Sequence, residues 1–191
     1  MSEAEVASFL AEERTVTCAT TGPRGWPHLM PLWYVLRDLG EGDTGPDDTG
    51  EGKSGEGKSE PGESEPAGTV GEAGGVGSRL WAWTYAASQK VRNLERDPRA
   101  TLQVEAGELY EELRGVMIES DVIVHRDIDT VGALGGEIFR RYASPRGEPP
   151  ADVLPREVAA MVDKQAAKRV ALEFVERRRA SWDHRKLAGV Y

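Results

Sequence analysis

The segment from Thr84 to Leu94 places polar and charged side chains where a strand would end and a helix would begin. Ser88 is suited to be the N-cap of that helix, and Lys90 and Arg92 fall in its first turn. Positive charges at this position oppose the helix dipole, which favours anions at the N-terminal end. The pattern is therefore typical of a helix start that binds a phosphate between cations and free backbone amides. The alternative is an ordinary solvated helix start in which Lys90 pairs with a nearby acid.

A second stretch, residues 52–59, matches the phosphate-loop pattern G-x-x-x-x-G-K-[ST]. A phosphate loop needs a buried strand before it and a helix after it, so that its amides point at the phosphates. Here the flanks are Gly, Glu, Ser and Pro, and the unit Gly-Glu-Gly-Lys-Ser is simply repeated. We interpret the match as a product of low complexity and not as a nucleotide site.

Other catalytic and metal-binding patterns are missing from the sequence. The single cysteine, Cys18, excludes a disulfide framework and is expected to be a buried thiol. No two of the three histidines have metal-ligand spacing, so no metal site is predicted. No nucleophile elbow or catalytic triad is present, and no catalytic residue is assigned.

The elements that must position the anion site are mostly short strands. Apolar and β-branched runs predict strands over residues 15–21, 28–37, 80–85, 100–105, 113–125 and 169–175. Helices are predicted from Ser2, from Ser88 to Asp97, from Asp127 and over residues 155–167. The run at 28–37 is almost wholly apolar, which indicates a strand covered on both faces. These elements predict one domain, mainly β, in which a barrel carries peripheral helices.

Residues 40–78 differ from the rest of the chain. Ten acidic residues there are opposed by two lysines, so this segment carries eight of the nine net negative charges. It has almost no large apolar side chains, and we expect a disordered, acidic, Gly-rich insertion that interrupts the domain. The remaining chain is nearly neutral, which argues against nucleic-acid binding. The first residues lack a signal peptide and no run is long enough to span a membrane, so a cytoplasmic protein is expected.

The sequence resembles the pyridoxamine 5′-phosphate oxidase-like superfamily of flavin and deazaflavin oxidoreductases, outside the insertion. Three segments carry the resemblance: Gly25 to Trp33, Thr84 to Arg99, and Ser181 to Leu187. It implies a split β-barrel, a homodimer with a cofactor at the interface, and FMN or a deazaflavin (coenzyme F-420) as that cofactor.

The resemblance also implies which residues contact the cofactor. The second strand would lie along the ring system, the junction at Thr84 to Lys90 would hold the phosphate, and the C-terminal strand and tail would reach the partner's cofactor. The implied cofactor-binding residues are Met30, Pro31, Leu32, Trp33, Val35, Trp83, Thr84, Ser88, Gln89, Lys90, Arg92, Arg169, Trp182, His184 and Lys186. For Trp182, anchoring of the tail by packing is an equal alternative.

One departure bears on activity. The pyridoxamine phosphate oxidases carry an Arg and a Lys near the ends of the ring-lining segment, and Met30 and Val35 stand at those positions here. Oxidation of a vitamin B6 substrate is therefore not expected, and the deazaflavin stays open. The sequence predicts an oxidoreductase that transfers hydride to or from a small organic substrate, in a slot lined by Trp33, Trp83 and Tyr85. The alternative is a non-catalytic flavin or tetrapyrrole carrier.

Overall fold

The computed structural model describes residues 1–38, 69–72, 78–145 and 153–187. In chain order the elements are α1 (Glu3–Glu12), β1 (Thr15–Thr21), β2 (Pro27–Asp38), β3 (Thr69–Glu72), β4 (Ser78–Tyr85), α2 (Gln89–Arg96), β5 (Arg99–Ala106), the 3-10 turn η1 (Tyr110–Glu112), β6 (Arg114–His125), α3 (Ile128–Ala143), α4 (Arg156–Ala166), β7 (Arg169–Asp183) and the 3-10 turn η2 (His184–Leu187).

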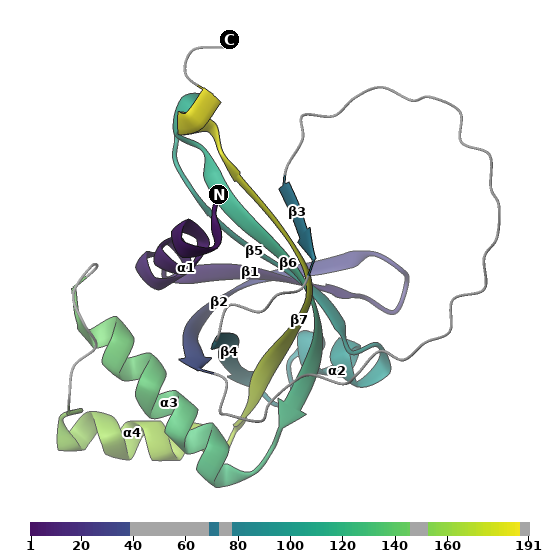
Figure 1. Cartoon of the computed structure of the whole chain (residues 1–191). Helices are drawn as coiled ribbons and strands as arrows, with labels where there is room; N and C mark the ends of the chain where they lie inside the picture. The colour runs from purple at the N-terminus through teal and green to yellow at the C-terminus, as the bar shows by residue number, and fades with distance from the viewer. Residues whose placement is uncertain (39–68, 73–77, 146–152, 188–191) are drawn as a thin grey trace.

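Six antiparallel strands close into a barrel (Figure 1). Their order is β7-β4-β2-β1-β5-β6, and the additional pairing of β6 with β7 closes the circle. The protein is therefore a mainly β split barrel with peripheral helices, as the sequence predicts. Closure leaves no unpaired edge between these strands, which is how small barrels avoid edge-to-edge association.

Strand β7 is long and pairs with three other strands. Its first part pairs with β4, most of its length pairs with β6, and β3 pairs with its Arg178–Ser181 segment. The β6–β7 register shifts between Glu119 and Ser120, so that Arg177 is an extra residue on β7. A bulge of this kind bends a strand, which lets β7 leave the barrel wall and continue to the C-terminal end.

Helix α1 closes one end of the barrel. Its N-terminus has the capping box that the sequence predicts: the Ser2 hydroxyl accepts from the Glu5 amide, and the Glu5 carboxylate accepts from the Ser2 amide. At its C-terminal end the buried Tyr34 hydroxyl donates to the carbonyl oxygen of Leu10. The Arg141 guanidinium donates to the carbonyls of Leu10, Ala11, Glu13 and Tyr34 over 2.7–3.0 Å. These bonds satisfy carbonyl groups that a helix end leaves unpaired.

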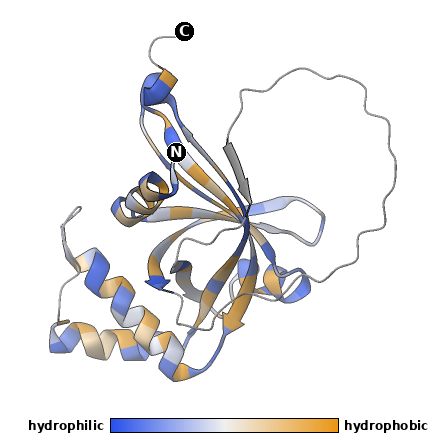
Figure 2. Ribbon diagram, in the orientation of Figure 1, coloured by the Kyte–Doolittle hydropathy of each residue, from blue (hydrophilic) through white to orange (hydrophobic). Residues whose placement is uncertain are grey.

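Two apolar cores hold the elements together. The first fills the barrel and includes Phe9, Tyr34, Leu102 and Phe174. The second lies outside the barrel wall, where α3 and α4 pack against β2, β4 and β7; its members include Val35, Trp83, Leu134, Ile138 and Val162. In Figure 2 hydrophobic and hydrophilic residues alternate along α3 and α4, as expected for helices with one buried side.

Helix α3 can approach the sheet because of one glycine. A Cβ on Gly135 would lie 2.5 Å from the Trp83 ring, well inside any allowed contact. The indole and the helix backbone therefore touch directly. This contact buries Trp83 beneath α3.

Most element boundaries agree with the sequence prediction, and three features differ. Strand β7 extends eight residues beyond the predicted end at Val175, to Asp183. Residues 69–72 form β3, inside the segment predicted to be a disordered insertion. The rest of that insertion before Ser78, with the phosphate-loop match at 52–59, lies outside the described residues, so disorder there stays a prediction.

The third difference is the exposure of β2, which the sequence predicts to be covered on both faces. The first half of β2 is instead exposed: Leu29 is 58%, Met30 42% and Trp33 48% accessible to solvent. The apolar run therefore reflects a surface that this chain does not itself cover.

None of the described helices combines the length and the hydropathy needed to cross a membrane.

Candidate functional site

The junction of β4 and α2 contains a buried lysine. The Lys90 side chain is only 4% exposed, and its Nζ donates to the Thr84 hydroxyl at 3.1 Å. No carboxylate among the described residues pairs with this ammonium group. Burial lowers the pKa of Lys90, and a negative charge on Cys18 would raise it in part. Burial in turn raises the pKa of the Cys18 thiol to about 11, so the thiol is protonated at neutral pH and supplies no counter-charge.

Other polar groups surround this lysine on the inner side of α2. Asn93, three residues after Lys90 on the same face of the helix, is fully buried and donates to the Thr20 hydroxyl at 3.0 Å. His28 lies opposite Thr20 in the β1–β2 ladder, and its Nδ1 is buried with no hydrogen-bond partner in the described structure. The N-cap Ser88 makes no side-chain capping bond, and its buried hydroxyl likewise lacks a partner in the described part of the chain.

The sequence analysis placed Ser88 and Lys90 correctly at a helix start but missed Thr20 and Asn93 as members of the cluster. Asn93 could have been found, because Lys90 and Asn93 have the spacing of one helix face. Thr20 could not, since its contact with Asn93 joins residues 73 positions apart.

Strand β2 contributes Met30 to this cluster. Directly opposed residues in an antiparallel ladder share a face, and Met30 is opposite the core residue Cys18. Met30 therefore points to the same side as Cys18, which interacts electrostatically with Lys90. From its 42% exposure we infer that Met30 lies where this side of the cluster opens to solvent, which we call the mouth of the cluster.

The implied ring-lining residues of β2 divide between two faces. Pro31, Trp33 and Val35 alternate with Met30 and Leu32, so one ligand cannot contact all five side chains. Leu32 is in the barrel core and Val35 is in the core under α3. Pro31 and Trp33 remain accessible on the outer face, where Trp33 stacks on Tyr142 with 4.4 Å between ring centroids.

The predicted aromatic slot of Trp33, Trp83 and Tyr85 is not formed. Trp83 is buried under α3, and Tyr85 is exposed beside it. The Arg169 guanidinium lies between the two, 4.4 Å from the Trp83 ring centroid and 4.1 Å from that of Tyr85. Adjacent residues of a strand point to opposite faces, so Tyr85 lies on the outer face of β4 while Thr84, which bonds Lys90, lies on the inner face. The cation–π contacts therefore hold Arg169 on the outer side of β4.

Two further candidates on α2 are not brought into the cluster. Gln89 is exposed and uses its amide nitrogen to bond the Asn93 side chain at 2.9 Å. Arg92 is exposed on the side of α2 away from Lys90, and no contact in the described structure holds it near the lysine. Gln89 thus supports the cluster indirectly, and Arg92 adds only a solvent-exposed charge.

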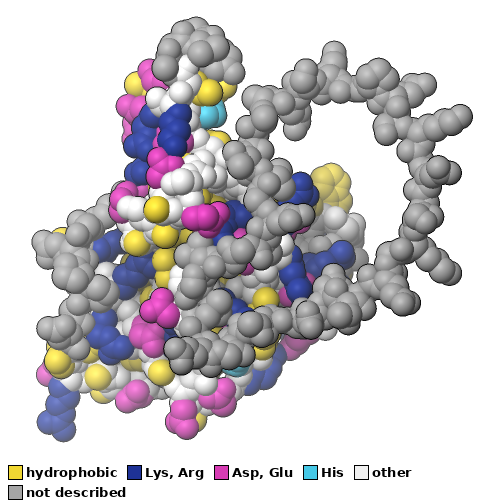
Figure 3. Space-filling view, viewed as in Figure 1, with side chains coloured by type: hydrophobic (Ala, Val, Ile, Leu, Met, Phe, Trp, Pro, Cys, Tyr) yellow, Lys and Arg dark blue, Asp and Glu magenta, His cyan; other side chains and the backbone are white. Residues whose placement is uncertain are grey.

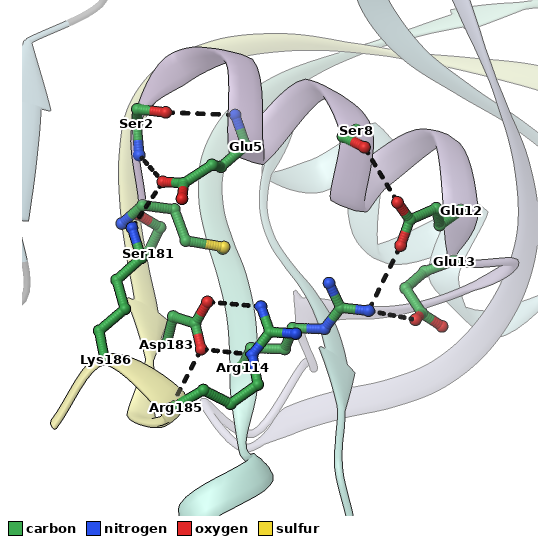
Figure 4. Close-up of polar contacts among 11 residues, drawn as sticks. Ser2, Glu5, Ser8, Glu12, Glu13, Arg114, Ser181, Asp183, Arg185 and Lys186 are labelled. Atoms are coloured by element: carbon green, nitrogen blue, oxygen red, sulfur yellow. Dashed lines mark hydrogen bonds and ion pairs between the residues drawn. The ribbon is translucent and has the colours of Figure 1, made fainter. Parts of the chain in front are cut away.

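The C-terminal candidates lie at the opposite end of the barrel from α2 (Figure 1). Trp182 packs on Gly115, where an added Cβ would lie 2.2 Å from the indole. His184 Nδ1 is 2.8 Å from the Tyr110 carbonyl oxygen. Lys186 Nζ bonds the Glu5 carboxylate at 2.7 Å, as Figure 4 shows. Within one chain these residues do not meet Lys90.

A cavity of about 590 Å³ lies between β1, β5 and β6 and borders Thr20. Its charged residues are Arg99, Glu119, Asp121 and Arg177, and Arg177 pairs with Asp121 at 2.7 Å. The cavity thus has two positive and two negative side chains, and Lys/Arg and Asp/Glu side chains are also interspersed on the face shown in Figure 3. Of the two locations, the Lys90 cluster holds a charge that no oppositely charged side chain pairs with in the described part of the chain.

No group of three or more His, Cys, Asp or Glu side chains in the described segments is arranged to hold a metal ion.

Comparison with known proteins identifies the fold. A conserved hypothetical protein from Mycobacterium tuberculosis, Rv2991, is 32% identical, with all of this chain and 90% of that chain covered and a TM-score of 0.67. A protein from Clostridium acetobutylicum related to general stress protein 26, of the pyridoxinephosphate oxidase family, is 13% identical (TM-score 0.52; 96% and 92% covered). The chain has the split-barrel fold of this pyridoxinephosphate oxidase family protein. An F420 reductase has the same fold at 19% identity (TM-score 0.50; 90% and 93% covered).

No family model matches this split-barrel sequence, and no curated protein matches it.

The cluster at the β4–α2 junction fits the phosphate of a flavin-type cofactor. An anion there would neutralise the buried Lys90 ammonium and accept hydrogen bonds from its two N–H groups that are not used on Thr84. It would also accept a hydrogen bond from the Ser88 hydroxyl, which has no partner among the described residues. The first-turn amides of α2 face the same end of the helix.

Proposed function

We propose that this split barrel is an oxidoreductase that binds FMN or a deazaflavin and transfers hydride to or from a small organic substrate. The observation that carries the proposal is the buried Lys90 ammonium, which pairs with no carboxylate among the residues that the structure describes. Leaving such a charge uncompensated costs several kcal/mol, which a bound anion would remove. Structural ion pairs in this protein are built differently: the buried Arg179 pairs with both Glu3 and Glu176 at 2.8 Å.

Each residue of the cluster has a distinct role in this proposal. Lys90 neutralises the phosphate, Thr84 and Ser88 orient it by hydrogen bonds, and Asn93 fixes α2 against Thr20 so that Lys90 keeps its position. Met30 covers the mouth and excludes water from the phosphate. The bound ring supplies the hydride chemistry, and the protein supplies position and electrostatics.

We further propose a homodimer with the cofactor at its interface. The exposed outer face of β2, with Leu29, Pro31 and Trp33, is an apolar surface that a second copy would cover. A second copy could also bring its Trp182 and His184 to the cofactor, which one chain cannot do.

The test is ligand binding by the purified protein. Titration with FMN and with coenzyme F-420, followed by absorbance and fluorescence, is expected to show binding of at least one of them. Lys90→Met should weaken that binding by roughly one hundredfold, since a charge-assisted hydrogen bond and its Coulomb attraction are lost. Lys164→Met, an exposed lysine of α4, is the matched control and should leave affinity unchanged. Equal affinity in the Lys90 variant and the wild type would contradict the proposal.

The non-catalytic carrier is the second candidate. The described residues at the cluster include no carboxylate that could act as a general acid or base, which suits a carrier as well as a hydride-transfer enzyme. The two candidates are separated by reducing the bound cofactor, adding an organic electron acceptor and measuring how fast the cofactor is re-oxidised. In an enzyme, the acceptor re-oxidises the bound cofactor faster than it re-oxidises free cofactor. In a carrier, binding to the protein slows this re-oxidation. Titration with haem tests the tetrapyrrole form of the same candidate.

A further inference from the structure

Arg169 is the first residue of β7 and lies directly opposite Tyr85 in the β4–β7 ladder. Opposed residues of a ladder share a face, so both side chains lie on the outer side of the sheet, whereas Thr84 and Lys90 meet on its inner side. The guanidinium carbon is 4.4 Å from the Trp83 ring centroid and 4.1 Å from the Tyr85 ring centroid. The two rings therefore fix the position of the guanidinium group.

The positive charge of Arg169 is not neutralised by any described residue. The side chain is half-buried, and its buried Nε makes no hydrogen bond in the part of the chain that the structure describes. An aromatic ring attracts a cation through its quadrupole but carries no net charge, so the cation–π contacts leave the charge in place. The guanidinium group is thus held ready for an anion.

Arg37 provides an internal comparison. It contacts the Trp81 ring at 4.5 Å, much as Arg169 contacts Trp83, but it also binds both carboxylate oxygens of Glu137 at 2.8 and 2.9 Å. The aromatic contact is therefore not a substitute for a carboxylate partner in this protein. Of these two arginines, Arg169 is the one that pairs with no carboxylate among the described residues.

The geometry of a guanidinium group favours a planar anion. Its N–H groups lie in one plane in a fixed fork, which matches the two oxygens of a carboxylate. Neither Trp83 nor Tyr85 accepts a conventional hydrogen bond from this fork, so its N–H groups remain for a ligand. Tyr85 is 52% exposed, and its ring offers an apolar surface to the body of such a ligand.

The surface around Arg169 continues toward β2. Trp83 and Trp33 both make edge contacts with Phe139, at 6.0 and 6.5 Å between ring centroids. Arg169 therefore adjoins the accessible outer face of β2, the strand expected to lie along the cofactor ring.

Resting on the proposed function, we propose that Arg169 binds the carboxylate of the substrate, and that the substrate is a small planar organic acid. The carboxylate binds the guanidinium fork, and the planar body lies beside the Tyr85 ring. The acid group is the part that is recognised, and the hydride is exchanged elsewhere on the molecule.

Benzoate and benzamide test the binding site in the purified full-length protein, because these planar probes have nearly the same size and shape but differ in charge. Followed by NMR titration, benzoate is expected to bind at least about tenfold more tightly, since it forms charge-assisted hydrogen bonds. The Arg169 Nε–H resonance, identified by its loss in Arg169→Met, should shift with benzoate and not with benzamide.

Variants assign the effect to one side chain. Arg169→Met is expected to lower the affinity for benzoate about tenfold, to the level of benzamide, and to leave benzamide binding unchanged, which shows that the variant is folded. Arg169→Lys keeps the charge but loses the fork and should recover only part of the affinity. Arg37→Met is the matched control, because it also removes a guanidinium group from a tryptophan ring, and it should leave benzoate binding unchanged.

Phenyl phosphate and the oligomeric state test the other occupants. Phenyl phosphate has the same ring and a tetrahedral anion, and it is expected to bind no more tightly than benzoate. Tighter binding of phenyl phosphate would make this a phosphate site and contradict the proposal. A change of molecular mass in Arg169→Met, measured by light scattering, would assign the guanidinium group to a contact with a second copy of the chain and would also contradict it.

The remaining outcomes separate this inference from the proposed function. If benzoate binds no better than benzamide, or if Arg37→Met weakens benzoate binding as much as Arg169→Met does, the carboxylate site is wrong, and the proposed function stands as long as FMN or coenzyme F-420 binds through Lys90. If benzoate binds through Arg169 but neither cofactor binds, the proposed function is wrong and Arg169 is an organic-acid site without a redox role.

Discussion

Replacing Lys90 by methionine should make the ligand-free protein more stable. Methionine has a similar length and shape but no charge, so the substitution removes an uncompensated buried ammonium without creating a large cavity. Exchanging buried charges for well-packed apolar groups typically stabilises a protein by about 1–4 kcal/mol. The Thr84 hydroxyl loses its partner at a cost of about 1 kcal/mol.

The net gain expected is about 1–2 kcal/mol, which for a chain of this size raises Tm by roughly 2–8 °C. Thermal unfolding of the ligand-free protein, followed by circular dichroism, measures it. Lys164→Met makes the same chemical change at an exposed site and should shift Tm by less than about 1 °C.

The pH dependence of the stability difference between the Lys90 variant and the wild type is an independent test, because the pKa of Lys90 fixes its direction. Burial lowers the pKa of Lys90 below its ordinary value of 10.5, so between the two values the unfolded chain binds more protons than the folded one. Below the pKa of Lys90 in the folded protein, the wild type therefore bears the full cost of burying a charged ammonium. This cost falls away as the pH rises from that pKa toward 10.5. The stability difference between the Lys90 variant and the wild type should shrink over that interval. A variant less stable than the wild type at neutral pH, or a difference that grows with pH, would refute the reasoning.

Three more predictions concern the scaffold. Replacing residues 39–77 by Asn-Gly should preserve the barrel and ligand affinity, because the strand ends that flank them are register partners and fit a two-residue hairpin turn; loss of ligand binding would show that the segment serves the site. Arg141→Met should lower the free energy of unfolding by about 3 kcal/mol in urea titrations, since its guanidinium satisfies four carbonyls, and Arg141→Lys should recover only part of that loss. The contact of Lys186 with Glu5 should break as the pH falls from 4.5 through about 2, because hydrogen bonds from Lys186 and the Ser2 amide lower the pKa of Glu5 to about 2; a tail amide-exchange rate that stays constant over that range would contradict it.

The sequence determined the elements and the class of fold because their signals are local. The capping box at Ser2, the alternating runs of the strands and the turn at Gly22–Gly25 act between residues close in the chain, and each element formed within a few residues of its predicted bounds, apart from the longer C-terminal strand. The position of Ser88 and Lys90 at the start of a helix was also predicted locally, and the phosphate site proposed there stays a prediction.

Only the tertiary structure decided which of the predicted site residues meet. Strand alternation and the docking of α3 put Val35 and Trp83 into a core, and Arg169 filled the predicted aromatic slot. The burial of Lys90 without a carboxylate from the described residues depends on which residues of β1, β2 and β4 surround α2 after closure of the barrel. Sequence spacing cannot supply that information, because a side chain's counter-charges come from segments far apart in the chain.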